Sequence, residues 1–324
     1  MRKKVFLLLI MALCAVLTSC YRNENSVLIY TSAESYRIED MRERLLEEFP
    51  EYEILIEYMP TGNQAAKLMM EGRETECDIT YDLEYTYLQK LAEEGVLADL
   101  SAYDYSVYRD DVAESKFYMP EYRNGGAVII NPAVLEKYDL EVPTCYDDLV
   151  KPEYKGLISM PNPASSGTGY MFLLAMANAR GEEAALEYFD ALAKNILQFT
   201  SSGSGPVNAL IQEEVAIGLG ITGTAVQAIN DGAELEIIFF EEGSPYALYG
   251  QGMIVGKETR PAVKEVYDFL YDTYAYENCE KFYPEPIFKD RVFEVENYPA
   301  DIDYCDMSGD TVEMKEHLLS LWKY

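Results

Sequence analysis

The chain alternates short apolar runs with amphipathic stretches along most of its length, and this alternation limits the folds open to it. The apolar run at residues 27–30 predicts a strand, and apolar side chains spaced three or four positions apart over 38–49 predict a helix after it. The next elements keep this order, with strands at 53–59 and 78–81 and helices at 64–70 and 85–94. Repeated strand–helix units favour a mostly parallel sheet with helices on both faces.

A second series of strands and helices follows the glycine-containing loop at residues 122–126. Its strands are expected at 127–130, 157–160, 215–219, 237–240 and 253–255, and its helices at 169–179, 182–192, 207–212 and 225–230. Two such series predict an α/β protein of two lobes, each with a mixed, mostly parallel sheet flanked by helices. Because no Gly/Ser-rich linker separates the series, we expect the lobes to share hinge strands.

The first twenty residues have the pattern of a secretion leader. Arg2, Lys3 and Lys4 precede an apolar core at 5–17, and Cys20 follows shortly after it. A core of about 13 residues is shorter than the roughly 20 that a transmembrane helix needs. The junction before Cys20 also resembles the lipobox of bacterial lipoproteins.

These features predict a lipoprotein signal peptide at residues 1–19, a lipid on Cys20 and a polar tether at 20–26. The protein would then be exported and anchored to the outer face of a bacterial membrane by the lipid on Cys20. An N-terminal membrane anchor that stays uncleaved is the alternative.

The acidic composition narrows the range of partners. The formal net charge is −31 at pH 7, which disfavours binding to nucleic acid and close contact with anionic lipid. Four cysteines follow Cys20 without any C-x-x-C pairing, at Cys77, Cys145, Cys279 and Cys305. Cys279 and Cys305 are the closest pair in sequence, but spacing alone does not establish a disulfide.

The segment at residues 159–170 is the most informative for function. A predicted strand runs there into Ser165, Ser166, Gly167 and Thr168, and an apolar helix follows. The start of such a helix would point free backbone N–H groups and hydroxyls at one place, which is the chemistry of an anion site. An ordinary helix cap is the alternative, although a cap needs only one hydroxyl.

Three further turns have similar compositions and also follow predicted strands. They contribute Ser202, Gly203 and Ser204 from 200–206, Thr222 from 220–224, and Thr31, Ser32, Ala33 and Glu34 directly after the first strand. In open α/β sheets ligands bind at the carboxyl ends of the strands. We therefore expect several of these turns to meet at one ligand.

Five stretches of the chain, at 28–33, 124–131, 163–168, 218–220 and 242–245, resemble extracellular solute-binding proteins of ABC transporters. The likeness is to the two-lobed type II periplasmic-binding-protein group, which includes binders of ferric iron, thiamine, polyamines and phosphonates. It implies a cleft between the lobes that closes on a small ligand, and an ABC transporter permease that recognises the closed form. We expect a monomer.

The resemblance also implies where the chain passes between the lobes. It would cross near residues 124–131 and return near 249–255. Lobe one would comprise 27–123 plus about 246–288, and lobe two 124–245 plus about 289–324.

The ligand class follows from the turns. Relatives that bind ferric iron generally place adjacent tyrosines in the loop that corresponds to 220–224, and this loop has none. Hydroxyl-rich helix starts instead favour an oxyanion such as a phosphonate or a phosphate ester. If the ligand also carries an amine, as aminoalkylphosphonates do, Tyr246 would pack on its carbon chain and one acidic side chain would face the amine, from among Glu34, Asp82, Glu84 and Glu242. Ferric iron and polyamines remain the alternatives, and a polyamine would require aromatic walls as well as carboxylates.

Catalysis has little support in the sequence. Ser204 is flanked by Gly203 and Gly205, which is not the G-x-S-x-G spacing of a serine hydrolase, and His317 is the only histidine. A metal-dependent hydrolase would need a cluster of His, Asp and Glu ligands that the sequence does not offer. A secreted hydrolase is therefore a remote alternative, and we expect neither a metal nor a cofactor. His317 is expected on the surface of a terminal helix.

Overall fold

The computed structural model describes residues 24–285 and 287–324. The predicted signal peptide at 1–19, Cys20 and the first residues of the predicted tether lie outside the described residues. The first strand, β1 (Ser26–Thr31), already begins at the last residue assigned to the tether, and Ser26 pairs there with Glu53.

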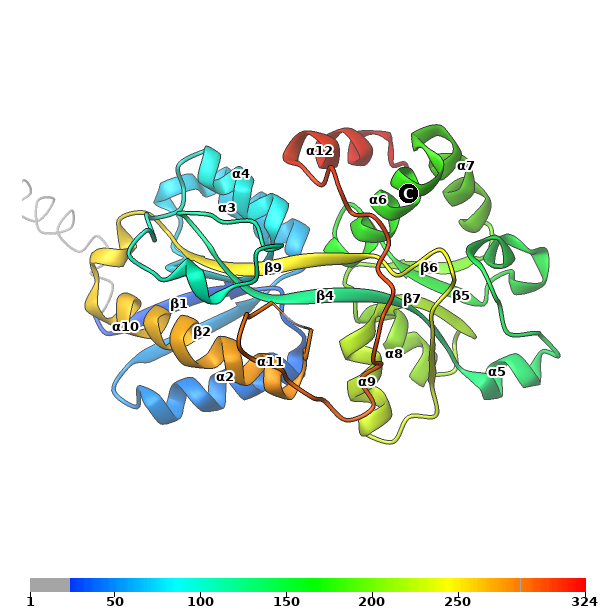
Figure 1. Ribbon diagram of the computed structural model, residues 1–324, viewed down its shortest axis with the longest axis horizontal. Coiled ribbons are helices and arrows are strands. Elements are labelled where there is room, and N and C mark those ends of the chain that lie inside the picture. Colours follow the sequence, from blue (N-terminus) through cyan, green and yellow to red (C-terminus); the bar gives the residue numbers. More distant parts are fainter. Residues whose placement is uncertain (1–23, 286) are drawn as a thin grey trace, which may run out of the picture.

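Two groups of parallel strands form the two lobes (Figure 1). In lobe one, β1 lies between β2 (Glu53–Tyr58) and β3 (Ile79–Glu84). In lobe two, β5 (Ile158–Pro161) lies between β6 (Ile196–Thr200) and β7 (Ile217–Ile221). The prediction of two α/β lobes with mostly parallel sheets is therefore confirmed.

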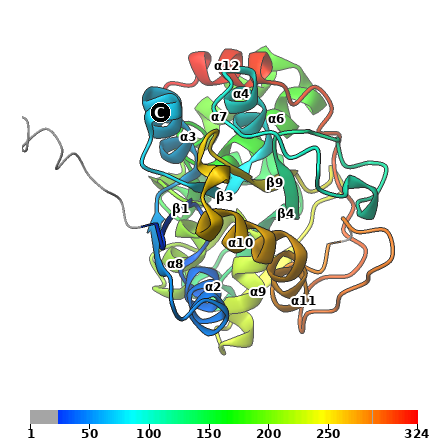
Figure 2. The same cartoon turned by 90° about the vertical axis from the view of Figure 1, so that its left-hand side faces the viewer.

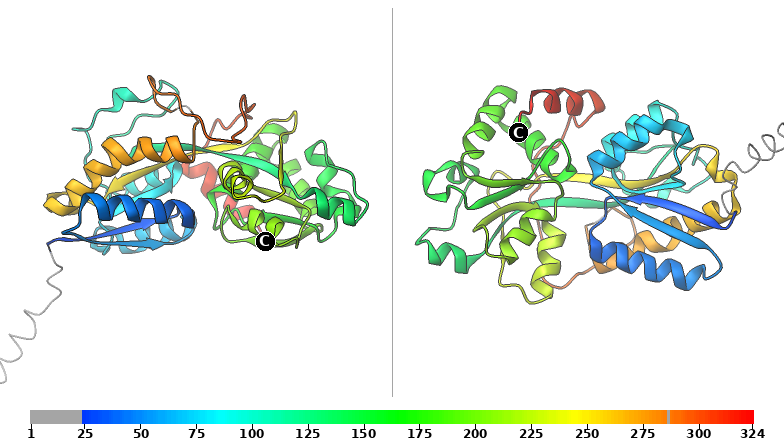
Figure 3. Two further views of the ribbon diagram at one scale, coloured as in Figure 1. Left: turned by 90° about the horizontal axis from the view of Figure 1, so that it is seen from below. Right: turned by 180° about the vertical axis from the view of Figure 1, so that it is seen from behind.

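Two longer strands join the lobes into one continuous sheet. β4 (Met119–Ile130) pairs antiparallel with β9 (Tyr246–Met253) through its first half and with β7 through its second half. The strand order is β2-β1-β3-β9-β4-β7-β5-β6, and the short β8 (Glu236–Ile238) also pairs with β4. Figure 3 shows both long strands running from one lobe into the other. The lobes thus share hinge strands, as the missing linker predicts.

Helices cover both faces of each half of the sheet (Figure 2). Lobe one carries α2 (Ser35–Glu48), α3 (Thr61–Glu71), α4 (Tyr85–Glu93), α10 (Pro261–Phe269) and α11 (Ala275–Lys281). Lobe two carries α5 (Pro132–Lys137), α6 (Gly167–Arg180), α7 (Glu182–Leu192), α8 (Gly205–Ile211) and α9 (Thr222–Asn230). All six residues of β1 are buried because helices lie on both of its faces, whereas the edge strand β2 is largely exposed.

The crossing of β4 between the lobes depends on glycine. A Cβ atom on Gly126 would lie 2.9 Å from the end of Met171, 3.0 Å from Phe172 and 3.0 Å from Pro245. Gly126 is also the first residue of β4 that pairs with β7, opposite Ile221. A side chain at this position would have to displace these neighbours, so Gly126 lets α6 and Pro245 pack closely on β4.

The C-terminal helix α12 (Val312–Leu321) contacts both lobes, packing on α6 and on α4. Lys315 forms a buried ion pair with Glu84, at the start of α4. Its ammonium group also lies 4.0 Å from the ring centre of Tyr87 and 4.1 Å from that of Tyr170, which belong to different lobes. The segment assigned to lobe two at 289–324 therefore also binds lobe one.

Two further observations concern the address of the protein and its cysteines. No helix in the described part of the chain combines the length and apolarity needed to cross a bilayer.

Cys77, Cys145, Cys279 and Cys305 are all free thiols. The closest pair in sequence is thus not joined, and Cys279 instead contacts the carbonyl oxygen of Glu121 at 3.3 Å.

Candidate ligand-binding cleft

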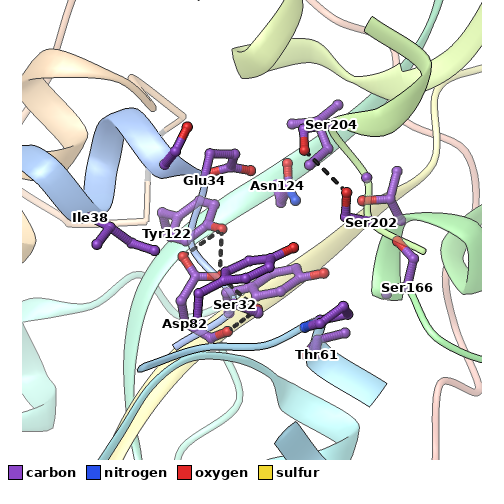
Figure 4. A pocket seen from close by; sticks show the side chains of 18 of the residues that line it. Ser32, Glu34, Ile38, Thr61, Asp82, Tyr122, Asn124, Ser166, Ser202 and Ser204 are labelled. Carbon is purple, nitrogen blue, oxygen red and sulfur yellow. Dashed lines mark hydrogen bonds between the residues drawn. The ribbon is translucent and has the colours of Figure 1, made fainter. Parts of the chain in front are cut away.

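A cavity of about 540 Å³ lies between the lobes, where the carboxyl ends of the parallel strands meet (Figure 4). Lobe one lines it with the turns after β1 and β2, with Asp82 of β3, and with the starts of α2 and α3. Lobe two lines it with the start of α6 and the loop before α8, and the hinge strands β4 and β9 form its floor. This is the position at which open α/β sheets bind ligands.

The lobe-one side of the cavity is lined by four charged side chains, Glu34, Glu39, Arg42 and Asp82. We call Glu34 and Asp82, with Arg37 behind them, the charged wall. Arg37 projects from α2 and is 1% exposed. Its Nη1 atom lies 3.0 Å from Glu34 Oε2 and also bonds to the carboxylate of Asp82. Its Nε atom donates to Asn278 at 2.9 Å. One buried cation therefore neutralises part of the charge of two buried carboxylates.

Asp82 is held in place from several directions. Its φ angle is +54°, a backbone conformation that costs energy in any residue with a side chain. The hydroxyl of Tyr122 lies 3.1 Å from both carboxylate oxygens, and Ser32 donates to one of them at 3.2 Å. Burial raises the pKa of Asp82, and the charge of Arg37 opposes that rise. Strained residues held this firmly are typical of binding sites.

Glu121 lies directly behind Asp82 and is fully buried. Its Oε1 atom accepts a hydrogen bond of 3.0 Å from the backbone N–H of Asp82. Burial and the neighbouring charge of Asp82 raise the pKa of Glu121 well above its usual value. Burial thus favours the protonated form of Glu121, which supports the charged wall from behind through this hydrogen bond.

The lobe-two side, which we call the hydroxyl wall, consists of Ser166, Gly167, Thr168, Ser202, Gly203 and Ser204. Ser166 caps α6, because the N–H of Gly169 donates to its hydroxyl at 3.5 Å. The hydroxyls of Ser202 and Ser204 lie 3.2 Å apart. Of the described residues that line the cavity from lobe two, none is charged.

Gly203 brings the two segments of the hydroxyl wall together. A Cβ atom at this position would lie 2.2 Å from the hydroxyl oxygen of Thr168 and 2.5 Å from Ile221. Only glycine lets the loop before α8 approach the first turn of α6 this closely. The hydroxyls and the first N–H groups of α6 therefore face the same space.

The floor of the cavity is built by Tyr122 and Asn124 on β4 and by Tyr249 on β9. The rings of Tyr122 and Tyr249 are stacked, with centres 5.5 Å apart. Burial raises the pKa of both phenols well above the usual value. Both rings therefore present neutral surfaces to the cavity.

Residues 77–301 match the model of a family described as bacterial extracellular solute-binding protein. The chain belongs to this family. It is an extracellular solute-binding protein of the ABC type, and the type II periplasmic-binding-protein fold is confirmed.

Three individual proteins illustrate the range of the likeness. An uncharacterized protein of Haemophilus influenzae is 28% identical over 207 residues, which cover 60% of this chain and 58% of that protein, less than two thirds of its length. The periplasmic binding protein AfuA of Actinobacillus pleuropneumoniae, with fructose-6-phosphate bound, superposes with a TM-score of 0.81 at 23% identity and covers 92% of this chain and 97% of its own. Iron-bound HitA of Pseudomonas aeruginosa gives 0.72 at 18% identity, with 91% and 97% covered. The two solved structures share the fold of this solute-binding protein.

Eight of the predicted ligand residues line the cavity of this solute-binding protein: Ser32, Glu34, Ser166, Gly167, Thr168, Ser202, Gly203 and Ser204. Five others lie outside its lining: Thr31, Ala33, Ser165, Thr222 and Tyr246. Ser165 instead donates to the carbonyl oxygen of Ser201 at 3.2 Å, and Tyr246 packs edge-on against Tyr304. The ligand roles of both groups remain predictions.

Of the four acidic residues that could face an amine of the ligand, two line the cavity and two do not. Glu34 and Asp82 line the cavity, whereas Glu84 is paired with Lys315 and Glu242 accepts from the backbone N–H of Tyr146 at 3.4 Å. Within the described residues no three His, Cys, Asp or Glu side chains gather closely enough to hold a metal ion. His317 lies on the surface of α12, 2.7 Å from Glu182.

Sequence reasoning did not assign a binding role to Tyr122, Asn124 or Tyr249, which form the floor. All three lie on hinge strands, within the first half of β4 and the first half of β9. The one signal in the sequence is the pair Gly125 and Gly126 after Asn124, which marks a close approach of backbone.

Proposed function

We propose that this solute-binding protein captures a small organic molecule that carries a phosphate or phosphonate group, and that it delivers this molecule to its ABC permease. The hydroxyl wall is the observation that carries the proposal. Hydroxyls and backbone N–H groups at the start of a helix bind an oxyanion well, because the helix dipole favours negative charge there. The cavity of about 540 Å³ is large enough for a small organic ligand.

The similarity to AfuA supports this choice, since that protein holds fructose-6-phosphate. The similarity to iron-bound HitA raises ferric iron as the competing ligand. Iron is disfavoured by the state of the floor tyrosines. The Tyr122 hydroxyl already bonds to Arg37 and Asp82, and burial raises its pKa, so conversion to a tyrosinate would be costly.

Contacts between the lobes support a closing mechanism. The backbone N–H of Gly62, in lobe one, donates to the carbonyl oxygen of Ser165, in lobe two, at 3.2 Å. A Cβ atom on Gly62 would lie 2.8 Å from the carbonyl oxygen of Ala164. Closure with a ligand inside would strengthen such contacts, and the ligand would thereby favour the closed form. No bond is made or broken in this mechanism, so we infer capture without catalysis.

A thermal-shift screen of the soluble mature domain tests the proposal. We expect fructose 6-phosphate or 2-aminoethylphosphonate to raise the melting temperature by several degrees, since a ligand at 100 times its Kd stabilises by about 2.7 kcal/mol. Ferric citrate and spermidine should leave it unchanged. A shift with iron together with a visible tyrosinate colour, or a shift with spermidine alone, would overturn the proposal.

The cellular location of the protein is also part of the proposal. Residues 1–19 would be removed as a lipoprotein signal peptide, and the lipid on Cys20 would hold a monomer close to its permease. Replacing Cys20 with Ala should move the protein from the membrane fraction to the soluble fraction without changing ligand affinity. Protein that stays with the membrane after this change would point to an uncleaved anchor.

A further inference from the structure

We infer that Asn124 selects ligands whose organic part carries hydrogen-bond donors, and that it reads them from the hinge strand shared by both lobes. This inference rests on the proposed capture of an organic phosphate or phosphonate and names the class of ligand more closely. Asn124 lies on β4 opposite Ala247 of β9, and two residues later the same strand pairs with β7. Asn124 therefore lines the cavity from a strand that both lobes share, so it belongs to neither lobe alone.

The side chain of Asn124 is buried and yet incompletely bonded. It is 2% exposed, lines the cavity, and its Oδ1 atom has no hydrogen-bond partner among the described residues. Figure 4 shows it between Glu34 of the charged wall and the serines of the hydroxyl wall. A buried acceptor without a partner is costly, so its presence at a cleft indicates that a ligand supplies the missing donor.

The groups around Asn124 differ between the two sides of the cavity, although Arg42 adds a cation to the lobe-one side. Glu34, Asp82 and the Oδ1 atom of Asn124 are hydrogen-bond acceptors, whereas the hydroxyl wall offers donors. The two carboxylates already accept hydrogen bonds from Arg37. Asn124 is thus the acceptor whose pairing depends most on the ligand.

A ligand that fits both sides has an oxyanion at one end and hydroxyl or ammonium groups beside it. The amide of Asn124 also bonds to the side chain of Tyr249, so its Oδ1 atom is the group that needs a donor. A simple alkylphosphonate would satisfy the hydroxyl wall but would leave this Oδ1 atom without one. Sites built to hydrogen-bond a donor strongly reject analogues that lack it, because the buried partner is then left without water or ligand. The shared chemistry of the selected ligands is therefore the donor, whether it comes from a sugar or from an amine.

Calorimetric titration of three ligands against wild-type protein and two variants tests the inference. The ligands are fructose 6-phosphate, 2-aminoethylphosphonate and ethylphosphonate, which lacks any donor on its organic part. Asn124→Leu removes the amide at similar volume, and Ser204→Ala is the comparison variant in the hydroxyl wall. We expect Asn124→Leu to weaken the tighter of the two donor-bearing ligands about tenfold and to leave ethylphosphonate unchanged. Ser204→Ala should weaken all ligands that bind by a similar factor.

A structural role for Asn124 predicts different results. If the amide mainly held the fold, Asn124→Leu would lower the melting temperature of the ligand-free protein and weaken all three ligands equally. We expect its melting temperature to be unchanged or raised, because an unpaired buried acceptor has been removed. Asn124→Asp keeps an acceptor oxygen and should retain the preference for donor-bearing ligands while weakening each through repulsion of the oxyanion.

The outcomes distinguish a failure of the role of Asn124 from a failure of the proposed function. If organic phosphates bind but Asn124→Leu affects them no more than ethylphosphonate, the selection by Asn124 is wrong and the proposed function stands. If none of the three ligands binds to the wild-type protein, the proposed function fails and the inference fails with it.

Discussion

The two walls of the cleft differ in how their polar groups are satisfied. On the charged wall, Glu34, Arg37 and Asp82 bond to one another and to protein groups around them. On the hydroxyl wall, Ser202 and Ser204 contact mainly each other, and no charged residue lines that side within the described chain. The carboxylates of the charged wall are paired within the protein, although Nη2 of Arg37 has no partner among the described residues, while the other wall offers hydroxyls to the cavity.

This difference shows why the overall charge of the protein does not identify its ligand. The chain has a net charge of −31, yet the side of the cleft with free bonding capacity is suited to an anion. Local N–H groups and hydroxyls decide the field within a cleft, and solvent screens the distant surface charges. We expect the charged wall to be essential for folding and the hydroxyl wall to be essential for binding.

The largest effect should come from removing the cation of the charged wall. Arg37→Met would leave two buried carboxylates without their partner, and we expect it to lower the free energy of unfolding by about 3–5 kcal/mol. Urea unfolding at pH 7 measures this loss. Arg42→Met is the matched control for stability on the same helix, because Arg42 is exposed and lines the cavity without being buried. Equal unfolding midpoints for the two variants would contradict the central role of Arg37.

A smaller effect is expected where acidic groups of lobe one meet α12. Burial and the charge of Glu84 raise the pKa of Asp310 to about 6, and Lys315 opposes that rise. The folded state thus favours protonated Asp310, so its contribution to stability is present at low pH and is lost as the pH rises through about 6. Asp310→Asn should remove this loss and gain roughly 2 kcal/mol relative to wild type between pH 4 and pH 7.5.

Unfolding curves at several pH values test this dependence. Asp306→Asn serves as the control, because hydrogen bonds from Ser308 lower the pKa of Asp306 rather than raise it. The prediction is wrong if the free energy of unfolding rises relative to wild type with rising pH in the Asp306 variant. It is also wrong if no such rise is seen in the Asp310 variant.

The smallest effect on stability, with a clear effect on binding, is expected on the hydroxyl wall. Ser166→Ala should weaken a bound organic phosphate three- to tenfold, about 1 kcal/mol, by removing one hydroxyl contact. The neighbouring Ser165→Ala is the matched control, since its hydroxyl bonds to Ser201 outside the cavity. Affinities are measured by titration with fructose 6-phosphate. Similar losses of affinity in both variants would show that Ser166 has no contact with the ligand that Ser165 lacks.

Much of the fold could be predicted because its signals are local. The helix at 182–192 has the bounds of α7, and the strands at 27–30 and 53–59 match β1 and β2 to within a residue. The strand β6 and the helices α10 and α11 were not predicted. β6 is a half-exposed edge strand without clear alternation, and α10 continues through a π-helical turn into α11, which blurs the helical period.

The candidate site was predictable in part for a similar reason. Turns that follow parallel strands must meet at one edge of a sheet, so the hydroxyl-rich turns could be placed together from their order alone. The floor could not be placed, because Asn124 reaches the cavity only through the pairing of β4 with β9, whose residues lie more than a hundred positions later. Gly125 and Gly126 mark a close approach of backbone there, but they do not identify the partner strand.

By itself, the sequence determined the alternation of strands and helices, the glycines and hydroxyls of the turns, and hence a two-lobed protein with donors at the carboxyl edge of its sheet. Only the tertiary structure decided that Ser166 faces the cavity while Ser165 does not, and that Arg37 is buried between Glu34 and Asp82. The physical reason is that composition and period act between neighbours along the chain. The direction of a side chain, and the charge it meets, depend on residues brought close only by folding.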